Sequence, residues 1–203
     1  PINLEPISEF YKLEGLEKRN IQISSLKIPK NRIVTITGES GCGKSTLVKD
    51  CIAPYFEKKY KKIAFNLIGQ DRNQSITSKS IIASFLMLKK RLDKFPSEIY
   101  KMTLDEAYDT VKSDKYMKPI VKMLIDLGLG YLSFNRQVNT LSTGEFQCIH
   151  LVSKLSDKNH DEMVLVFDEP SKGLSQNILN LFMKVMRDIV KDDNKTILLI
   201  EHN

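Results

Sequence analysis

A glycine-rich segment at residues 38–45, with the sequence GESGCGKS, fits the pattern G-x-x-x-x-G-K-S. A short β-branched run at residues 32–37 precedes it, and a helical pattern at residues 44–52 follows. This strand–loop–helix context is typical of a loop that cradles phosphates, because glycines let backbone N–H groups turn inward and the start of a helix adds partial positive charge. Such a loop binds a nucleotide, with Lys44 reaching the β- and γ-phosphates and Ser45 binding Mg²⁺.

The simpler interpretation of this segment is a glycine-rich turn before a helix, and the lysine and serine at its end weigh against it. Cys42 is interpreted as a small neutral filler of the loop. A redox role is the alternative, since thiolates are favoured at helix N-termini. The residues predicted to bind the nucleotide here are Gly38, Glu39, Ser40, Gly41, Cys42, Gly43, Lys44, Ser45 and Thr46.

A second motif is an apolar strand pattern at residues 163–167 that ends in two adjacent acids, Asp168 and Glu169. We expect Asp168 to hold the Mg²⁺ shell, directly or through water, and Glu169 to polarise the attacking water as a general base. An acidic pair after a strand indicates by itself only a solvated strand end. The phosphate-binding pattern upstream makes the catalytic interpretation the stronger one.

Composition is that of an ordinary globular protein: the 203 residues are 41% hydrophobic and 28% charged, which excludes a disordered or fibrous chain. No apolar run approaches the roughly 20 residues of a membrane span, and no signal peptide is visible. The three widely spaced cysteines exclude a disulfide framework and favour a reducing, cytoplasmic location. The net charge of +6 suits nucleic acid, nucleotide or an acidic partner, and it is also common in lysine-rich proteins with no such role.

The order of the patterns predicts an α/β fold with a mostly parallel core sheet and N-terminal antiparallel strands. Strand patterns fall at residues 20–29, 32–37, 62–68, 163–167 and 196–200. Beyond the helix that follows the glycine-rich loop, helices are expected at residues 81–92, 104–112, 117–127 and 176–190. Thr103 and Glu106 form a possible capping box for one of them. We therefore expect a nucleotide-binding core at residues 1–72 and 157–203, with a helical subdomain at residues 73–156 inserted in it.

Two further segments are weaker signals. LSTGE at residues 141–145 begins a helical pattern, and serine with glycine at a helix N-terminus is an anion-binding arrangement. By itself this segment indicates only a good N-cap. His202 follows the last strand pattern, and a lone histidine is more often structural or solvated than functional.

Taken together, these segments resemble an ATP-binding cassette (ABC) P-loop ATPase. The matching order is the P-loop, Gln70, an LSxGE-type signature, the acidic pair, a D-loop-like SKGL at residues 171–174, and His202 as the switch histidine. The resemblance implies ATP and Mg²⁺ as cofactors. It also implies a second cassette, in a homodimer or in the other half of a longer chain. The signature residues that would meet its nucleotide are Ser142, Gly144 and Glu145, and the residues implied in catalysis are Glu169, His202 and Gln70, the last also as a metal contact.

Within that superfamily, three segments are similar to the UvrA family of DNA-repair ATPases, in particular to its second cassette. MTLDEA at residues 102–107, LGLGYL at 127–132 and EHN at 201–203 resemble that family's M-T-x-x-E-A, V-G-L-G-Y and E-H-N segments. The resemblance implies ATP-driven dimerisation coupled to DNA binding, with other repair subunits as partners. Residues 86–101 replace the family's zinc module, so no zinc is expected, and Thr143 stands where the signature's first glycine usually lies.

Other functions remain open at this point. One is the motor subunit of a membrane transporter, with a membrane-embedded partner. Another is a cassette that regulates or assembles another macromolecule, such as the ribosome. The lysines of the helical subdomain indicate either a DNA-binding face or a solvated helix surface. Tyr11 is a candidate for stacking on adenine, and equally an ordinary surface tyrosine.

Overall fold

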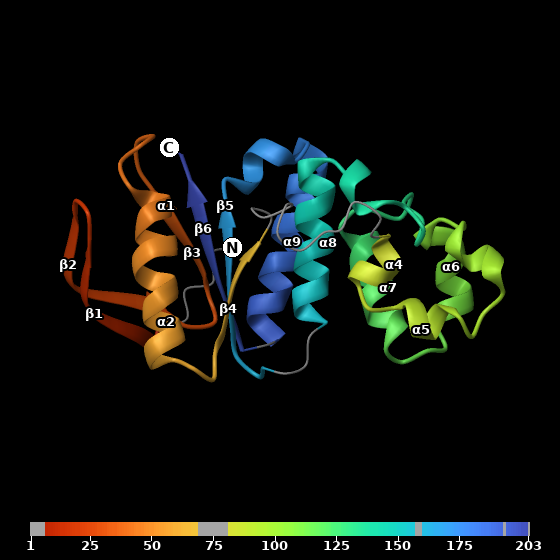
Figure 1. Cartoon of the computed structure of the whole chain (residues 1–203), viewed down its shortest axis with the longest axis horizontal. Coiled ribbons are helices and arrows are strands. Elements are labelled where there is room, and N and C mark those ends of the chain that lie inside the picture. The colour runs from red at the N-terminus through yellow and green to blue at the C-terminus, as the bar shows by residue number, and fades with distance from the viewer. Residues whose placement is uncertain (1–6, 69–80, 157–159, 193, 203) are drawn as a thin grey trace. The chain divides into compact units, whose positions relative to one another are not determined.

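A computed structural model describes residues 7–68, 81–156, 160–192 and 194–202, and the chain divides into two compact units. The first unit comprises Pro1–Leu67, Asn159–Glu169 and Met186–Asn203, and the second comprises Ile68–Lys158 and Pro170–Val185. The second unit thus includes residues that the sequence-based division assigned to the nucleotide-binding core. Figure 1 labels the helices and strands and colours the chain from the N-terminus to the C-terminus.

The first unit is built on a four-stranded sheet in the order β3-β6-β5-β4. Its strands are β3 (Ile33–Thr37), β4 (Ala64–Ile68), β5 (Met163–Asp168) and β6 (Lys195–Glu201). β6 runs parallel to both β3 and β5, which confirms the predicted parallel core. The register pairs Thr37 with Glu201 and Asp168 with Ile200, so these three strands end at the same edge. Loops at that edge are where open α/β sheets bind ligands.

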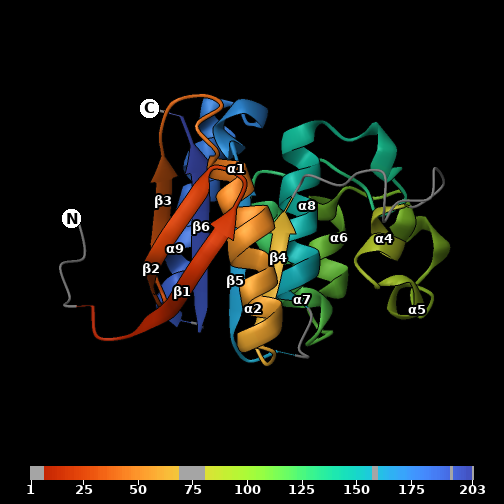
Figure 2. The same ribbon diagram turned by 60° about the vertical axis from the view of Figure 1, so that its left-hand side comes forward.

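An antiparallel hairpin and a helical segment complete the first unit (Figure 2). The hairpin pairs β1 (Phe10–Lys18) with β2 (Ile21–Pro29), and β2 corresponds to the strand predicted at residues 20–29. After the P-loop, α1 (Lys44–Thr46), the π-helical turn η1 (Leu47–Ile52) and α2 (Ala53–Lys59) follow without a break. Their apolar faces share one core with the hairpin and the sheet, formed by Tyr11, Leu13, Val48, Ile52, Phe56, Val164, Val166, Leu198 and Ile200, among others.

The second unit is helical among the residues that the structure describes. Its longer helices are α6 (Leu104–Val111), α7 (Met117–Asp126) and α8 (Thr143–Leu155), and α9 (Gln176–Asp192) begins in it. Its short helical segments are α4 (Ile82–Phe85), α5 (Lys89–Leu92), η2 (Ser97–Tyr100), η3 (Val138–Thr140) and η4 (Pro170–Gly173). No helix in the described part of the chain is both long enough and apolar enough to cross a bilayer.

The single helix predicted at residues 81–92 is wrong. The chain breaks at Met87, which has a left-handed backbone (φ 57°), and the Leu88 N–H donates to the Ala83 carbonyl at 2.8 Å. Leu86 and Leu88 are both buried, although residues two apart point away from each other on a helix. The turn buries both leucines and leaves Met87 82% exposed.

Candidate nucleotide-binding site

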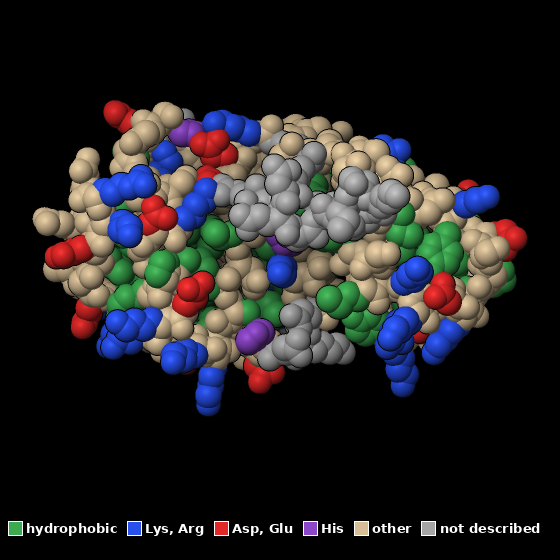
Figure 3. All heavy atoms as spheres, viewed as in Figure 1, with side chains coloured by type: hydrophobic (Ala, Val, Ile, Leu, Met, Phe, Trp, Pro, Cys, Tyr) green, Lys and Arg blue, Asp and Glu red, His purple; other side chains and the backbone are tan. Residues whose placement is uncertain are grey.

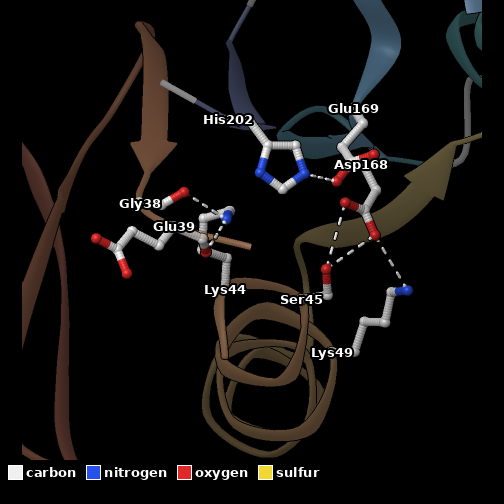
Figure 4. A network of polar contacts seen from close by, with 8 residues as sticks. All are labelled: Gly38, Glu39, Lys44, Ser45, Lys49, Asp168, Glu169 and His202. Carbon is white, nitrogen blue, oxygen red and sulfur yellow. Dashed lines mark hydrogen bonds and ion pairs between the residues drawn. The ribbon is translucent and has the colours of Figure 1, made fainter. Parts of the chain in front are cut away.

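The P-loop, the glycine-rich segment at residues 38–45, follows the end of β3. It enters α1 through two left-handed glycines, Gly41 (φ 78°) and Gly43 (φ 98°). Gly43 is the N-cap of α1, a position whose backbone conformation other residues rarely adopt. The Lys44 ammonium folds back and donates to the Gly38 carbonyl at 2.7 Å and the Glu39 carbonyl at 2.8 Å. Lys44 is therefore only 8% exposed, and Figure 4 shows its Nζ held inside its own loop.

The remaining loop residues differ in exposure. Gly38, Gly43, Ser45 and Thr46 are partly buried, whereas Glu39, Ser40, Gly41 and Cys42 are exposed. A Cβ added at Gly38 would lie 2.9 Å from Cys42 Sγ, so the thiol lies close against the start of the loop. The exposed backbone is therefore the surface that this loop can offer to an anion.

Ser45 and Asp168 lie together, as a shared metal site requires. Ser45 Oγ donates toward the Asp168 carboxylate, at 3.1 and 3.3 Å from its two oxygens. A hydroxyl and a carboxylate are oxygen donors of the kind that Mg²⁺ prefers, so the pair fits that ion. Elsewhere in the described residues, no group of three or more His, Cys, Asp or Glu could hold a metal.

Lys49 also reaches this carboxylate, a contact that sequence reasoning missed. Its Nζ lies 3.2 Å from Asp168 Oδ2, and the Asp168 side chain is only 11% exposed. Lys49 follows Ser45 by four residues in a continuous helical segment, a spacing that places both side chains on one face. That spacing is the sequence signal that would have found it. The Lys49 ammonium therefore balances the charge of the Asp168 carboxylate.

The structure brings Glu169 and His202 together, although the resemblance implied separate roles for them. Glu169 follows β5 with a left-handed backbone (φ 52°), and its N–H donates to the Ile200 carbonyl at 2.8 Å. The Glu169 carboxylate forms a hydrogen bond with His202 Nε2, just past the end of β6. Both side chains are about 30% exposed, so solvent water reaches the pair (Figure 4).

The signature residues belong to the second unit. Ser142 is exposed at the N-cap of α8, where its Oγ accepts from the Glu145 N–H at 3.2 Å. Glu145 Oε2 in turn accepts from the Ser142 N–H at 2.5 Å, which completes a capping box. Gly144 is buried and Thr143 is exposed.

Of the remaining candidate residues, Tyr11 lies in the core and Gln70 lies outside the described residues. Tyr11 is fully buried rather than a surface residue, and its hydroxyl donates to Glu162 Oε1 at 2.6 Å. The Lys30 ammonium lies 4.8 Å from the centre of the Tyr11 ring and 2.9 Å from the same Glu162 oxygen. This ring is packed in the core and is not available to stack on a nucleotide base, so that interpretation of Tyr11 is wrong.

Comparisons with known proteins find relatives of the UvrA family that the sequence segments resemble. UvrABC system protein A is 30% identical to this chain over 107 residues in Listeria monocytogenes and 33% in Staphylococcus aureus. Each alignment covers 53% of this chain and 11% of the relative, so the matched part is a small portion of those proteins.

Solved structures show the fold. UvrA2 from Deinococcus radiodurans aligns with a TM-score of 0.80 at 18% identity, covering 98% of this chain and 34% of that chain. CbiO1 from Clostridium perfringens, part of the ABC transporter complex cbiONQ, aligns with a TM-score of 0.60 at 20% identity, covering 96% and 80%. The profile of one family, described as ABC transporter, matches residues 21–172. This chain therefore belongs to the ABC transporter family, has the ABC ATPase fold, and is related to UvrA.

Proposed function

We propose that this chain binds and hydrolyses ATP as one cassette of a pair. The observation that carries the proposal is the convergence of three strand ends at one sheet edge. There the P-loop Lys44, the Ser45–Asp168 pair and the Glu169–His202 pair supply groups for phosphate, metal and water. This division of roles suits phosphoryl transfer, which depends on positioning and charge stabilisation more than on covalent chemistry.

Phosphate binding begins with an exchange of partners. Lys44 leaves the Gly38 and Glu39 carbonyls for the β- and γ-phosphates, because charge-assisted hydrogen bonds to an anion are stronger than those to neutral carbonyls. The P-loop N–H groups hold the same phosphates. Ser45 and Asp168 would hold Mg²⁺ together with Gln70. When bound, that ion neutralises charge on the phosphates.

Hydrolysis requires a base beside the γ-phosphate. Glu169 accepts a proton from the attacking water, and His202 orients the Glu169 carboxylate and hydrogen-bonds the γ-phosphate. The partner cassette closes the site with its signature segment, placing Ser142 and Gly144 at the phosphate. Cleavage of the γ-phosphate removes the anion that joins two positively biased helix ends, so the cassettes separate.

Replacement of the proposed base tests this mechanism. In Glu169→Gln, turnover falls by a factor on the order of 10²–10⁴, while ATP binding persists and the closed dimer becomes more stable. Turnover is measured by phosphate release, binding by titration with a fluorescent ATP analogue, and dimerisation by sedimentation. Asp161→Asn, an isosteric change at an exposed acid before β5, serves as the control. Unchanged turnover in Glu169→Gln would refute the assignment of the general base.

We further propose that this ATPase cycle is coupled to DNA, as part of a repair system or a relative of one. The proposal is supported by the relatives named UvrABC system protein A and by the TM-score of 0.80 to UvrA2. The second unit exposes many lysines: Lys89, Lys90, Lys94, Lys101, Lys112, Lys115, Lys118 and Lys122. Acidic side chains are interspersed among the basic ones, as the face in Figure 3 illustrates.

DNA coupling is tested by binding at increasing salt, with and without a non-hydrolysable ATP analogue. We expect nucleotide-dependent affinity that falls steeply with salt, because phosphate contacts release counterions. Double substitution of Lys89 and Lys90 by Gln should reduce the salt slope, whereas a Lys58/Lys59 double substitution on α2 serves as the control. Affinity that ignores salt would contradict the proposal.

The second candidate is the ATPase subunit of a membrane transporter. Structures of ABC transporter proteins with TM-scores of 0.58 to 0.61 favour it, although these values lie below the value for UvrA2. An absence of DNA binding in every nucleotide state, together with intact ATP hydrolysis, would favour this candidate over DNA coupling.

A further inference from the structure

Two segments that resemble UvrA sequences, at residues 102–107 and 127–132, have no role in the chemistry proposed above. The second unit brings them together. At the start of α6, the Leu104 N–H donates to the Leu132 carbonyl at 2.7 Å, and the Asp105 N–H donates to the Gly130 carbonyl at 3.0 Å. These two bonds fix the backbone on either side of Tyr131.

The turn lies close against the start of α6. A Cβ added at Gly130 would lie 2.2 Å from Asp105 Oδ1, so the side chain of Asp105 lies where any larger residue would project. Thr103, the N-cap of α6, also forms an isolated bridge with Ser133. The Tyr131 backbone is therefore held by the first turn of α6.

The Tyr131 side chain continues this series of contacts to the signature segment. Its hydroxyl donates to Glu145 Oε1, while Glu145 Oε2 accepts from the Ser142 N–H. The two carboxylate oxygens thus have different donors, and rotation of the carboxylate would break both bonds. Burial and the bond to Glu145 raise the pKa of Tyr131 to about 12, so the hydroxyl remains a donor at neutral pH.

This bond is separable from the packing of the unit. Tyr131 is 56% exposed and contributes little to the core. Ser142 and Glu145 cap α8 reciprocally without it. The Tyr131 hydroxyl therefore adds orientation to a carboxylate that already caps the helix.

We infer that Tyr131 is a positioning residue, which fixes Glu145 and thereby orients Ser142 for the nucleotide of a partner cassette. The inference rests on the proposed pairing of two cassettes. Tyr131 also links α6 to the signature segment, so that a displacement of the first turn of α6 changes the orientation of Ser142. The UvrA-like segments at residues 102–107 and 127–132 would therefore hold the signature segment in position.

The test compares Tyr131→Phe with Tyr100→Phe. Tyr100 provides a matched control because its hydroxyl also donates to a carboxylate of the second unit, Asp93 Oδ1, at 2.6 Å, away from the signature segment. Both changes are made in the Glu169→Gln background of the whole chain. ATP-dependent association is measured by sedimentation, nucleotide affinity by fluorescence titration, and stability by thermal unfolding.

We expect Tyr131→Phe to weaken ATP-dependent association about tenfold, because Glu145 and Ser142 are then held less firmly in the orientation that meets the partner's nucleotide. Nucleotide affinity and the midpoint of thermal unfolding stay at the values of the parent, and Tyr100→Phe associates as the parent does. Parent-like association of Tyr131→Phe would overturn the inference. A loss of association accompanied by an equal loss in Tyr100→Phe, or by a lowered unfolding midpoint, would overturn it in favour of a general structural effect.

A pH series provides a readout that a packing defect would not move. Burial raises the pKa of Glu145, but hydrogen bonds from Tyr131 and Ser142 and the charge of Arg136 outweigh it and hold that pKa below its ordinary value. Cys148, whose thiol pKa is raised mainly by burial and then by Glu145, stays neutral. Without the Tyr131 hydroxyl the pKa of Glu145 rises toward its ordinary value, so as the pH falls, association of Tyr131→Phe is lost at a higher pH than association of the parent.

Failure of the inference is distinct from failure of the proposed function. Suppose that the parent binds nucleotide and dimerises in the presence of ATP, but that Tyr131→Phe loses association at the same acidic pH as the parent. The positioning role is then wrong and the ATPase proposal stands. If the parent neither binds nucleotide nor associates, both are wrong.

Discussion

The P-loop region of the first unit and the signature region of the second both contain a helix N-terminus, but their polar side chains are held by different kinds of contact. In the proposed function, each helix N-terminus faces the phosphates of a nucleotide. At the P-loop edge, the charged side chains are held by contacts that a ligand can replace, as in Lys44 on loop carbonyls and Lys49 on Asp168. At the signature, Ser142 and Glu145 hold each other through a capping box. Under the proposed function, nucleotide binding exchanges partners at the first region, whereas the capping box already holds the second region in place.

The largest effect is expected from Lys44→Ala, which removes the group that moves from the loop to the phosphates. Affinity for a fluorescent ATP analogue should fall by about 100-fold, since hydrogen bonds to charged groups each contribute about 1.5–3 kcal/mol. Thermal unfolding should change little, because the two carbonyls released can bind water. Lys59→Ala, an exposed lysine at the end of α2, controls for charge alone. If Lys44→Ala kept its affinity for the ATP analogue, Lys44 would not exchange its loop carbonyls for phosphate, and the P-loop would not differ from the signature region in this respect.

An intermediate effect is expected from Lys49→Met, which leaves Asp168 without its ammonium partner. The nucleotide-free protein should then bind Mn²⁺, a spectroscopic substitute for Mg²⁺, up to about fivefold more tightly, as expected for the loss of a competing, partly exposed ion pair. Electron paramagnetic resonance measures the free ion. Lys58→Met provides the matched control on the same helical segment. An unchanged or weaker affinity for Mn²⁺ would show that Lys49 does not compete for the carboxylate.

The smallest effect is expected from Thr143→Gly at the first position of α8. The side chain is exposed, so its removal opens the approach to Ser142 while costing about 0.5–1 kcal/mol of stability. Turnover should rise a few-fold at saturating ATP, measured by phosphate release, and urea unfolding gives the cost. A fall in turnover with normal stability would mean that the threonine contacts the nucleotide productively.

Local patterns were sufficient to predict most of the fold. The alternating strand and helix patterns gave the parallel sheet, because buried strands and amphipathic helices carry their periodicity in the sequence. The capping box at Thr103 was predicted correctly from spacing alone, and the structure shows both of its hydrogen bonds. The roles predicted for the P-loop and acidic residues stay predictions, although the structure places Ser45 beside Asp168.

Contacts between segments that are distant in the sequence could not be predicted from local patterns. The hydrogen bond between His202 and the Glu169 carboxylate depends on the register of β5 against β6 and on a left-handed backbone at a non-glycine residue. Neither feature has a local signature in the sequence. The break at Met87 arises because tertiary burial of Leu86 and Leu88 overrides a helical pattern. The burial of Tyr11 likewise depends on residues far away in the sequence, because its ring packs against Phe56 and Tyr60 in the core and its hydroxyl donates to Glu162.

The central claim is that main-chain amides of residues 38–45, together with Lys44, hold the triphosphate of a nucleotide. A crystal structure of the chain grown with Mg²⁺ and a non-hydrolysable ATP analogue tests it most directly. We predict the β- and γ-phosphates within the loop, with Lys44 Nζ moved from the Gly38 and Glu39 carbonyls to phosphate oxygens. A loop without phosphate, with Lys44 still on its own carbonyls at saturating analogue, would contradict the account.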